Sequence, residues 1–146
     1  MTDSIRQRII TAIDTRFKTI LIANGYQTNM GNHVFAWRTE ALQESELDGL
    51  VYKDRTETKV EGCGIDEFTM PVEIEIDSTS PEQVRKCLAD LEKAIKVDRT
   101  WGQLAIHTKL ETSEMAVEQK EKSFAASKIL MAVEYQTVMG DPLTGA

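Results

Sequence analysis

The chain has 146 residues, of which 41% are hydrophobic, and its formal net charge is −7. This composition suits a single domain (residues 1–146) with one core and differs from that of a disordered segment. The acidic balance argues against nucleic-acid recognition, which needs a basic face, and no run approaches the roughly 20 apolar residues of a membrane span. Because the N-terminus has no export signal, we expect a cytoplasmic protein with reduced cysteines.

The first element in chain order is an amphipathic helix. Its apolar residues recur at spacings of three and four, at Ile5, Ile9, Ile13, Phe17 and Ile20. This spacing predicts a helix with one buried face. Asp3 or Ser4 can cap its start, and Asn24-Gly25 can end it because glycine tolerates the left-handed conformation. We therefore expect a helix over residues 3–24.

Three strands are predicted next, over residues 34–39, 50–60 and 69–77, because apolar and polar residues alternate in each. The alternation in residues 50–60 puts Lys53, Arg55, Glu57 and Lys59 on one face. Asp54 is out of place on the other. In residues 69–77, Pro71 donates no hydrogen bond, so the strand is expected to be unpaired there or to lie at an edge.

A second helix begins at Ser80-Pro81-Glu82-Gln83. Serine caps the helix, proline occupies its first position, and glutamine three residues after the serine completes a capping box. The predicted buried stripe is Val84, Leu88, Leu91 and Ile95, and the helix is expected to end near residues 96–98.

Two further strands are predicted over residues 104–112 and 124–137, joined by a polar hairpin loop at 114–122. Weak alternation in residues 124–137 favours a central strand covered on both faces. Residues 138–146 are expected to be a frayed tail. The order helix, three strands, helix, two strands predicts an α+β fold with two layers: a mostly antiparallel or mixed sheet of about five strands, with both helices on one face.

Few residues are candidates for chemistry. Cys63 lies between two glycines, but acidic neighbours raise a thiol pKa, whereas a nucleophilic cysteine needs a cation, a histidine or a helix N-terminus. His33 and His107 are the available bases, and nothing local places either beside Cys63. Cys87 reads as a small core residue. We therefore expect no catalysis.

Metal ligands and acidic clusters have two interpretations each. The spacing of the cysteines and histidines matches no zinc motif. Glu73, Glu75 and Asp77 are either a solvated strand face or ligands for a hard divalent cation shared with a partner. Residues 40–67 hold nine carboxylates and three basic residues, which indicates either a solvated loop or a docking surface for a basic partner.

The layout resembles the tail terminator proteins of long-tailed bacteriophages, the family of minor tail protein U. The similarity lies in four stretches: a long N-terminal helix ending at residues 24–26, an apolar strand at 47–52 before a long loop, and two longer segments. Residues 70–95 (MPVEIEIDSTSPEQVRKCLADLEKAI) are similar to the family's alternating strand and Pro-containing helix entry, and residues 122–137 (KSFAASKILMAVEYQT) to its closing strand.

The resemblance implies a structural virion or prophage protein without a cofactor. Such proteins form a homo-hexameric ring that caps the tail tube, stops its polymerisation and offers a surface to the head–tail connector. They are made in the host cytoplasm and end in the virion tail. We expect residues 53–68 to be a mobile acidic loop that contacts the tail tube protein. Its candidate partner-binding residues are Lys53, Arg55, Glu57, Lys59, Glu61, Asp66 and Glu67.

Three other functions stay open at the level of sequence. The chain could be another head–tail joining or tail completion protein, because these also combine small α+β domains with ring symmetry. It could be a ligand-binding regulatory module of the same fold class. An enzyme that uses Cys63 is the third.

Overall fold

A computed structural model describes residues 3–119 and 123–146. The helices are α1 (Ile5–Phe17) and α2 (Pro81–Val97), with short 3-10 turns at Ile22–Asn24, Met30–Asn32 and Glu44–Glu46. The strands are β1 (Val34–Ala36), β2 (Gly49–Asp54), β3 (Thr58–Glu61), β4 (Ile65–Ser78), β5 (His107–Gln119), β6 (Ser123–Val138) and β7 (Asp141–Gly145).

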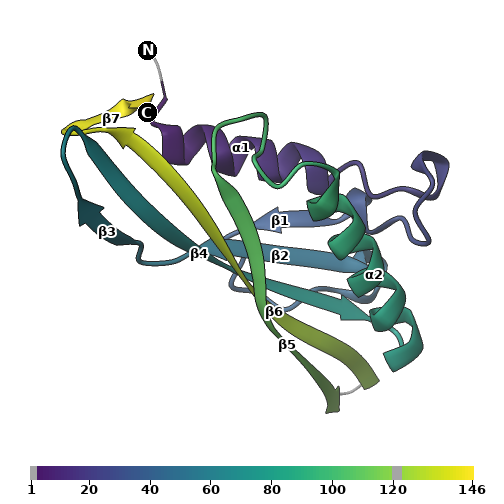
Figure 1. Cartoon of the computed structure of the whole chain (residues 1–146). Coiled ribbons are helices and arrows are strands. Elements are labelled where there is room, and N and C mark those ends of the chain that lie inside the picture. Colours follow the sequence, from purple (N-terminus) through teal and green to yellow (C-terminus); the bar gives the residue numbers. More distant parts are fainter. Residues whose placement is uncertain (1–2, 120–122) are drawn as a thin grey trace.

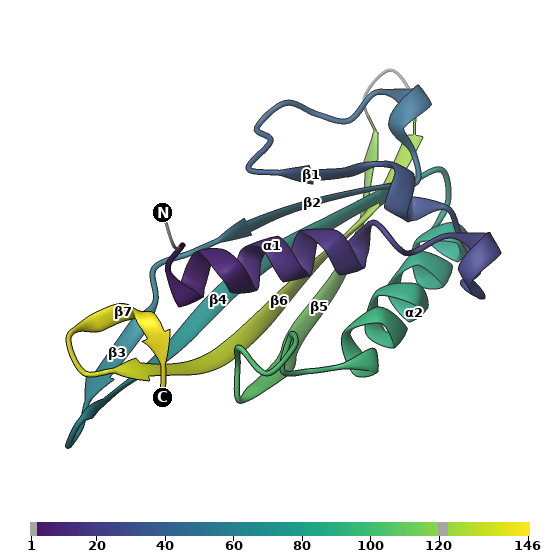
Figure 2. The same cartoon turned by 90° about the horizontal axis from the view of Figure 1, so that it is seen from above.

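In this described part, the strands form one mixed sheet, and both helices lie on the same face of it (Figures 1 and 2). The strand order is β1-β2-β4-β6-β5, with β3 beside β4 and β7 beside β6. Only β1 runs parallel to its neighbour, and the other pairs are antiparallel. The predicted α+β class, with helices packed against a sheet, is confirmed.

The long pair β4–β6 is the centre of the sheet. Its register runs without interruption from Ile65 opposite Val138 to Ser78 opposite Ala125. Even-numbered β4 residues and odd-numbered β6 residues face the helices and form the core with the buried face of α1. The central position predicted for residues 124–137 is correct. The expectation that both faces of this strand are covered is wrong, since Lys128 and Glu134 are exposed on the other side.

Helix α1 is shorter than predicted. Ser4 caps it as expected, with its hydroxyl accepting from the Gln7 amide at 3.1 Å, but the helix ends at Phe17. Beyond it, the Gly31 amide donates to the Ile20 carbonyl at 2.8 Å. This tertiary bond holds residues 18–24 in a turned path that buries Ile20 and leaves Ile22 exposed.

The predicted strand over residues 50–60 is two strands. Strand β2 ends with Asp54 opposite Val72, and β3 begins with Thr58 opposite Thr69. The break between them lies opposite Pro71, which lacks an amide hydrogen and only accepts, from the Arg55 amide at 2.8 Å. Pro71 therefore has no strand partner on this side of β4, as expected, although β4 is not an edge strand. The missing hydrogen bond divides the neighbouring strand into β2 and β3.

The expected acidic loop over residues 53–68 is mostly strand. Residues 53–54 belong to β2, Thr58–Glu61 to β3 and 65–68 to β4, so a hairpin occupies this place. The C-terminal prediction is also wrong: residues 141–145 form β7, which pairs with the end of β6. The Arg8 guanidinium donates to the Leu143 carbonyl at 2.6 Å and holds this segment against α1.

Helix α2 begins as predicted, with Pro81 at its first position and the Ser80 hydroxyl accepting from the Gln83 amide at 3.2 Å. The Gln83 side chain does not return to the cap. It donates instead to the Asp48 carboxylate at 2.8 Å, which ties α2 to the segment before β2.

Strand β5 begins later and ends later than predicted. Residues 101–103 have positive φ values and turn the chain, so that Trp101 is buried while Ile106 is 53% exposed. The Trp101 indole donates to the Thr108 hydroxyl at 2.7 Å and packs edge-on against Phe17. At the other end, residues 114–119 continue as strand; residues 120–122 of the predicted loop lie outside the described residues.

Candidate assembly surface

The sheet has a face that neither helix covers, and we call it the open face. Its described side chains come from the odd-numbered residues of β4, the even-numbered residues of β6, and Val51 and Lys53 of β2. Charged and apolar residues share it, and Glu73 and Glu75 lie on it, at positions that the strand alternation assigned to one face. The seven predicted partner-binding residues do not share this face.

The reason is a one-residue change of register. The residue numbers of paired β2 and β4 positions sum to 126, as in Lys53 opposite Glu73. Between β3 and β4 the sum is 127, as in Lys59 opposite Phe68. A shift of one residue moves every side chain to the other face. Lys53 therefore lies on the open face, while Lys59 lies on the helix side.

Glu57 belongs to an ion-pair network on the helix side. The Arg6 guanidinium donates to Asp54 at 2.6 Å and lies 3.0 Å from Glu57, whose carboxylate also accepts from the Tyr135 hydroxyl. The Trp37 indole donates to the other Asp54 oxygen at 2.9 Å. Burial works to raise the pKa of Asp54, but the hydrogen bonds from Arg6 and Trp37 outweigh it and hold that pKa below its usual value. This network joins α1 to the β2–β3 connection.

Asp66 is a buried structural carboxylate rather than a surface group. It is 3% exposed, accepts from the Gly140 amide at 3.0 Å and lies 3.6 Å from the Lys59 ammonium. The Lys59 ammonium also lies 3.3 Å from Glu61. Asp66 thus fastens the turn between β6 and β7 to the β3–β4 hairpin.

Lys53 and Arg55 meet on the open face, where both approach Glu73. Arg55 donates to Glu73 at 2.7 Å, and Lys53 lies 3.8 Å from the same carboxylate. The bond from Arg55 is the main reason that the pKa of Glu73 falls below its usual value, with smaller contributions from Lys53 and Lys128. Three cations therefore surround one carboxylate at this place.

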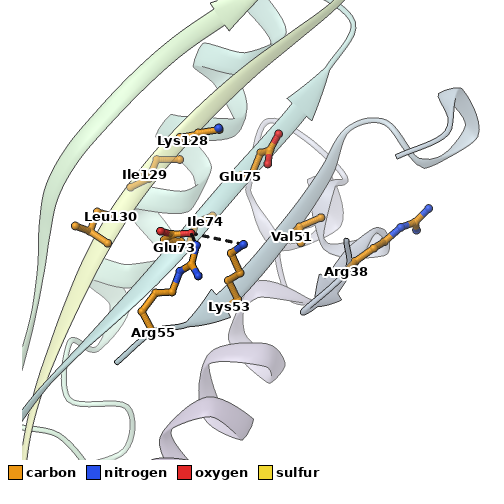
Figure 3. Close-up of a pocket in the computed structure, with 10 residues that line it drawn as sticks. All are labelled: Arg38, Val51, Lys53, Arg55, Glu73, Ile74, Glu75, Lys128, Ile129 and Leu130. Atoms are coloured by element: carbon orange, nitrogen blue, oxygen red, sulfur yellow. Dashed lines mark hydrogen bonds and ion pairs between the residues drawn. The ribbon is translucent and has the colours of Figure 1, made fainter. Parts of the chain in front are cut away.

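These side chains line a cleft of about 420 Å³, which we call the open-face cleft (Figure 3). Its charged side chains are Arg38, Lys53, Arg55, Lys128, Glu73 and Glu75. Val51 and Leu130 add apolar surface between them. Arg38 is already paired with Glu46, yet the remaining three cations still exceed the two carboxylates. In a chain of net charge −7, the open-face cleft is thus locally positive.

The sequence did not identify Lys128 or the apolar residues of the hairpin as site residues. Lys128 lies on the open face directly opposite Glu75, at an even position of a strand that appeared covered on both sides. Strand alternation places Val60 on the face opposite Lys59, and the register change turns that face away from the helices, so that Val60 is 58% exposed on the open face. Pro71 was the one signal for this change.

The β3–β4 hairpin ends in a turn that carries Cys63. The Gly62 amide donates to the Ile65 carbonyl at 2.8 Å, and Gly64 has a φ of +78°. Cys63 is exposed and Cys87 is buried. No histidine, cysteine or carboxylate cluster large enough for a metal ion occurs among residues 3–119 and 123–146.

No protein-family model matches this chain, and no curated protein sequence is significantly similar to it. In the described part of the chain, neither helix has the length and apolar character needed to cross a membrane.

Proposed function

We propose that the chain is a structural subunit that assembles into a ring at the end of a bacteriophage tail, as a tail terminator without catalytic activity. The ring consists of copies of this chain. One side of it meets the last ring of the tail tube and stops polymerisation, and the other offers a surface to the head–tail connector. This is the function that the order of elements in the sequence favours.

The observation that carries the proposal is the uncovered face of the sheet. An antiparallel sheet often has one face on the core and one in solvent, and the solvent face is a broad surface that another subunit can cover without disturbing the core. Here one face of a long β4–β6 pair is open, and it extends into a hairpin that projects from the end of the molecule away from α2 (Figures 1 and 2). Strand β5 adds a long sheet edge, which is suited to strand addition by a partner.

The test is electron microscopy of tails assembled with and without the protein. If the proposal is correct, tubes made without it are overlong and of variable length, and addition of the purified chain restores a defined length. Tubes of normal length in its absence would exclude the role.

The structure also changes how the contact with the tube should be tested. Deleting residues 53–68 would remove Asp54 and Glu57, which are both carboxylate partners of Arg6, together with the Arg55 carbonyl that Arg6 also donates to and all of β3. A loss of function in that deletion would report misfolding. Charge reversal at exposed Glu61, which pairs only with Lys59 among the described residues, leaves the Arg6 network intact and is the sharper variant.

A further inference from the structure

We propose that the tip of the β3–β4 hairpin of one copy docks into the open-face cleft of a second copy. The hairpin tip comprises residues 60–67. The inference deepens the proposed function, because it names the contact between copies that builds the assembly. It rests on two surfaces of this chain that match in charge and in apolar character.

The hairpin tip is acidic and partly apolar. Val60 and Ile65 are exposed on the open face, and Ile65 lies opposite Val138, which is also exposed. Glu61 and Glu67 add negative charge at the same end of the molecule. Such apolar side chains at the end of a projecting hairpin gain free energy when a partner covers them.

The open-face cleft offers the complementary groups. Lys53, Arg55 and Lys128 provide positive charge around Glu73, while Val51 and Leu130 provide an apolar floor. A carboxylate from the hairpin tip would meet an excess of cations there, since Lys53, Arg55 and Lys128 outnumber Glu73 and Glu75. Charge complementarity of this kind fixes the orientation and partner of a contact more than its strength.

A hairpin tip cannot reach the cleft of its own chain. Ile65 and Glu73 are on the same strand, and eight residues of strand at about 3.3 Å each separate them by about 26 Å. A hairpin tip in the cleft therefore belongs to another copy. Because the two surfaces differ, the contact either repeats head to tail and closes a ring, or is exchanged reciprocally between two copies.

Cys63 allows a direct test, because it is exposed at the hairpin tip while Cys87 is buried. Equal amounts of ¹⁴N- and ¹⁵N-labelled full-length chain are mixed at about 1 mM, where even a contact of about 4 kcal/mol occupies roughly 40% of the sites. A short thiol–amine cross-linker then joins Cys63 to lysines within reach. We expect links from Cys63 to Lys53 and Lys128 in peptide pairs of mixed isotope label.

Charge reversal shows whether the pairing is specific. Lys128→Glu should lower the mixed-isotope link from Cys63 to Lys53 about tenfold, and adding Glu67→Lys should restore most of it. Lys86→Glu is the matched control, since Lys86 lies on α2, away from the open face, and this change should leave the yield unaltered. Circular dichroism confirms that each variant is folded.

The outcomes separate this contact from the proposed function. Links that stay within one isotope label, or that Lys128→Glu leaves unchanged, overturn the contact. If rings that terminate tails form without these links, the contact is wrong and the function stands. If the links form but native mass spectrometry finds no assembly larger than two copies, the contact stands and the ring is wrong.

Discussion

Replacing Arg6 tests the network that joins α1 to the sheet. Arg6→Gln removes the cation between Asp54 and Glu57 and leaves two carboxylates facing each other. Breaking a fully buried pair costs 3–5 kcal/mol, whereas an exposed pair contributes about 1 kcal/mol or less. The three side chains are 29%, 18% and 23% exposed, so we expect an intermediate loss of about 2 kcal/mol at pH 7.

This loss depends on pH in a defined direction. The folded-state pKa of Asp54 lies below its ordinary value of 3.8, so its contribution to stability is present above that value and is lost as the pH falls through the folded-state pKa. In Arg6→Gln the part of that contribution that comes from Arg6 is already absent, while the hydrogen bond from Trp37 remains. The difference between the two proteins should therefore be smaller at pH 3 than at pH 7.

The measurement is urea unfolding followed by circular dichroism at both pH values. With an m-value of about 2 kcal/mol/M, a loss of about 2 kcal/mol moves the midpoint by about 1 M. Arg8→Gln is the control, because within the described part of the chain Arg8 donates to two backbone carbonyls, those of Asp3 and Leu143, and to no carboxylate. An equal loss for Arg6→Gln at pH 3 and pH 7 would refute the electrostatic reasoning and assign the effect to packing.

Three further predictions concern single residues. Asp90→Ala should cost about 3 kcal/mol in urea unfolding, because buried Asp90 accepts from the backbone amide and the hydroxyl of Thr28; a loss under 1 kcal/mol would contradict this. Gly31→Ala should cost about 3 kcal/mol, since its methyl group would lie 2.6 Å from a backbone carbonyl oxygen, while Gly64→Ala, in open space with φ of +78°, should cost about 1 kcal/mol; the reverse order would show the close approach to be unimportant. Burial raises the pKa of the Cys87 thiol from 9.0 to about 12, so its contribution is complete below pH 9 and is lost towards pH 12. Cys87→Ala should flatten the decline of the urea midpoint between pH 8 and about 10.5, and an unchanged slope would exclude this thiol as a cause.

The patterns that face the core were predictable from the sequence. The spacing of Ile5, Ile9, Ile13 and Phe17 gave the buried stripe of α1, and strict alternation gave the helix-facing side of β4. These patterns are visible in the sequence because each residue on the buried face of a regular helix or strand must be apolar for the same reason, its removal from water. The Ser80-Pro81 entry of α2 was equally local, since its hydrogen bond spans three residues.

What could not be predicted depends on contacts between distant residues. After α1 ends at Phe17, the Gly31 amide bonds to the Ile20 carbonyl, and no local pattern in residues 18–24 predicts that bond. The tail pairs with β6 as β7, and its Leu143 carbonyl accepts from Arg8, 135 residues away in the sequence. Burial of Trp101 likewise requires three successive residues with positive φ, two of which are not glycine.

At the candidate site, local patterns were again predictable from the sequence, whereas the pairing of distant strands was not. Charge and position in the sequence selected Lys53 and Lys59 together, and strand alternation assigned them to one face. A single missing amide, that of Pro71, lets the partner of β4 change from β2 to β3 with a slip of one residue. The slip sends Lys59 to the helix side, where it meets Asp66, and turns Val60 to the open face. An apolar side chain exposed by this register change, at the end of a projecting hairpin, is the physical reason to look for a second copy of the chain at that surface.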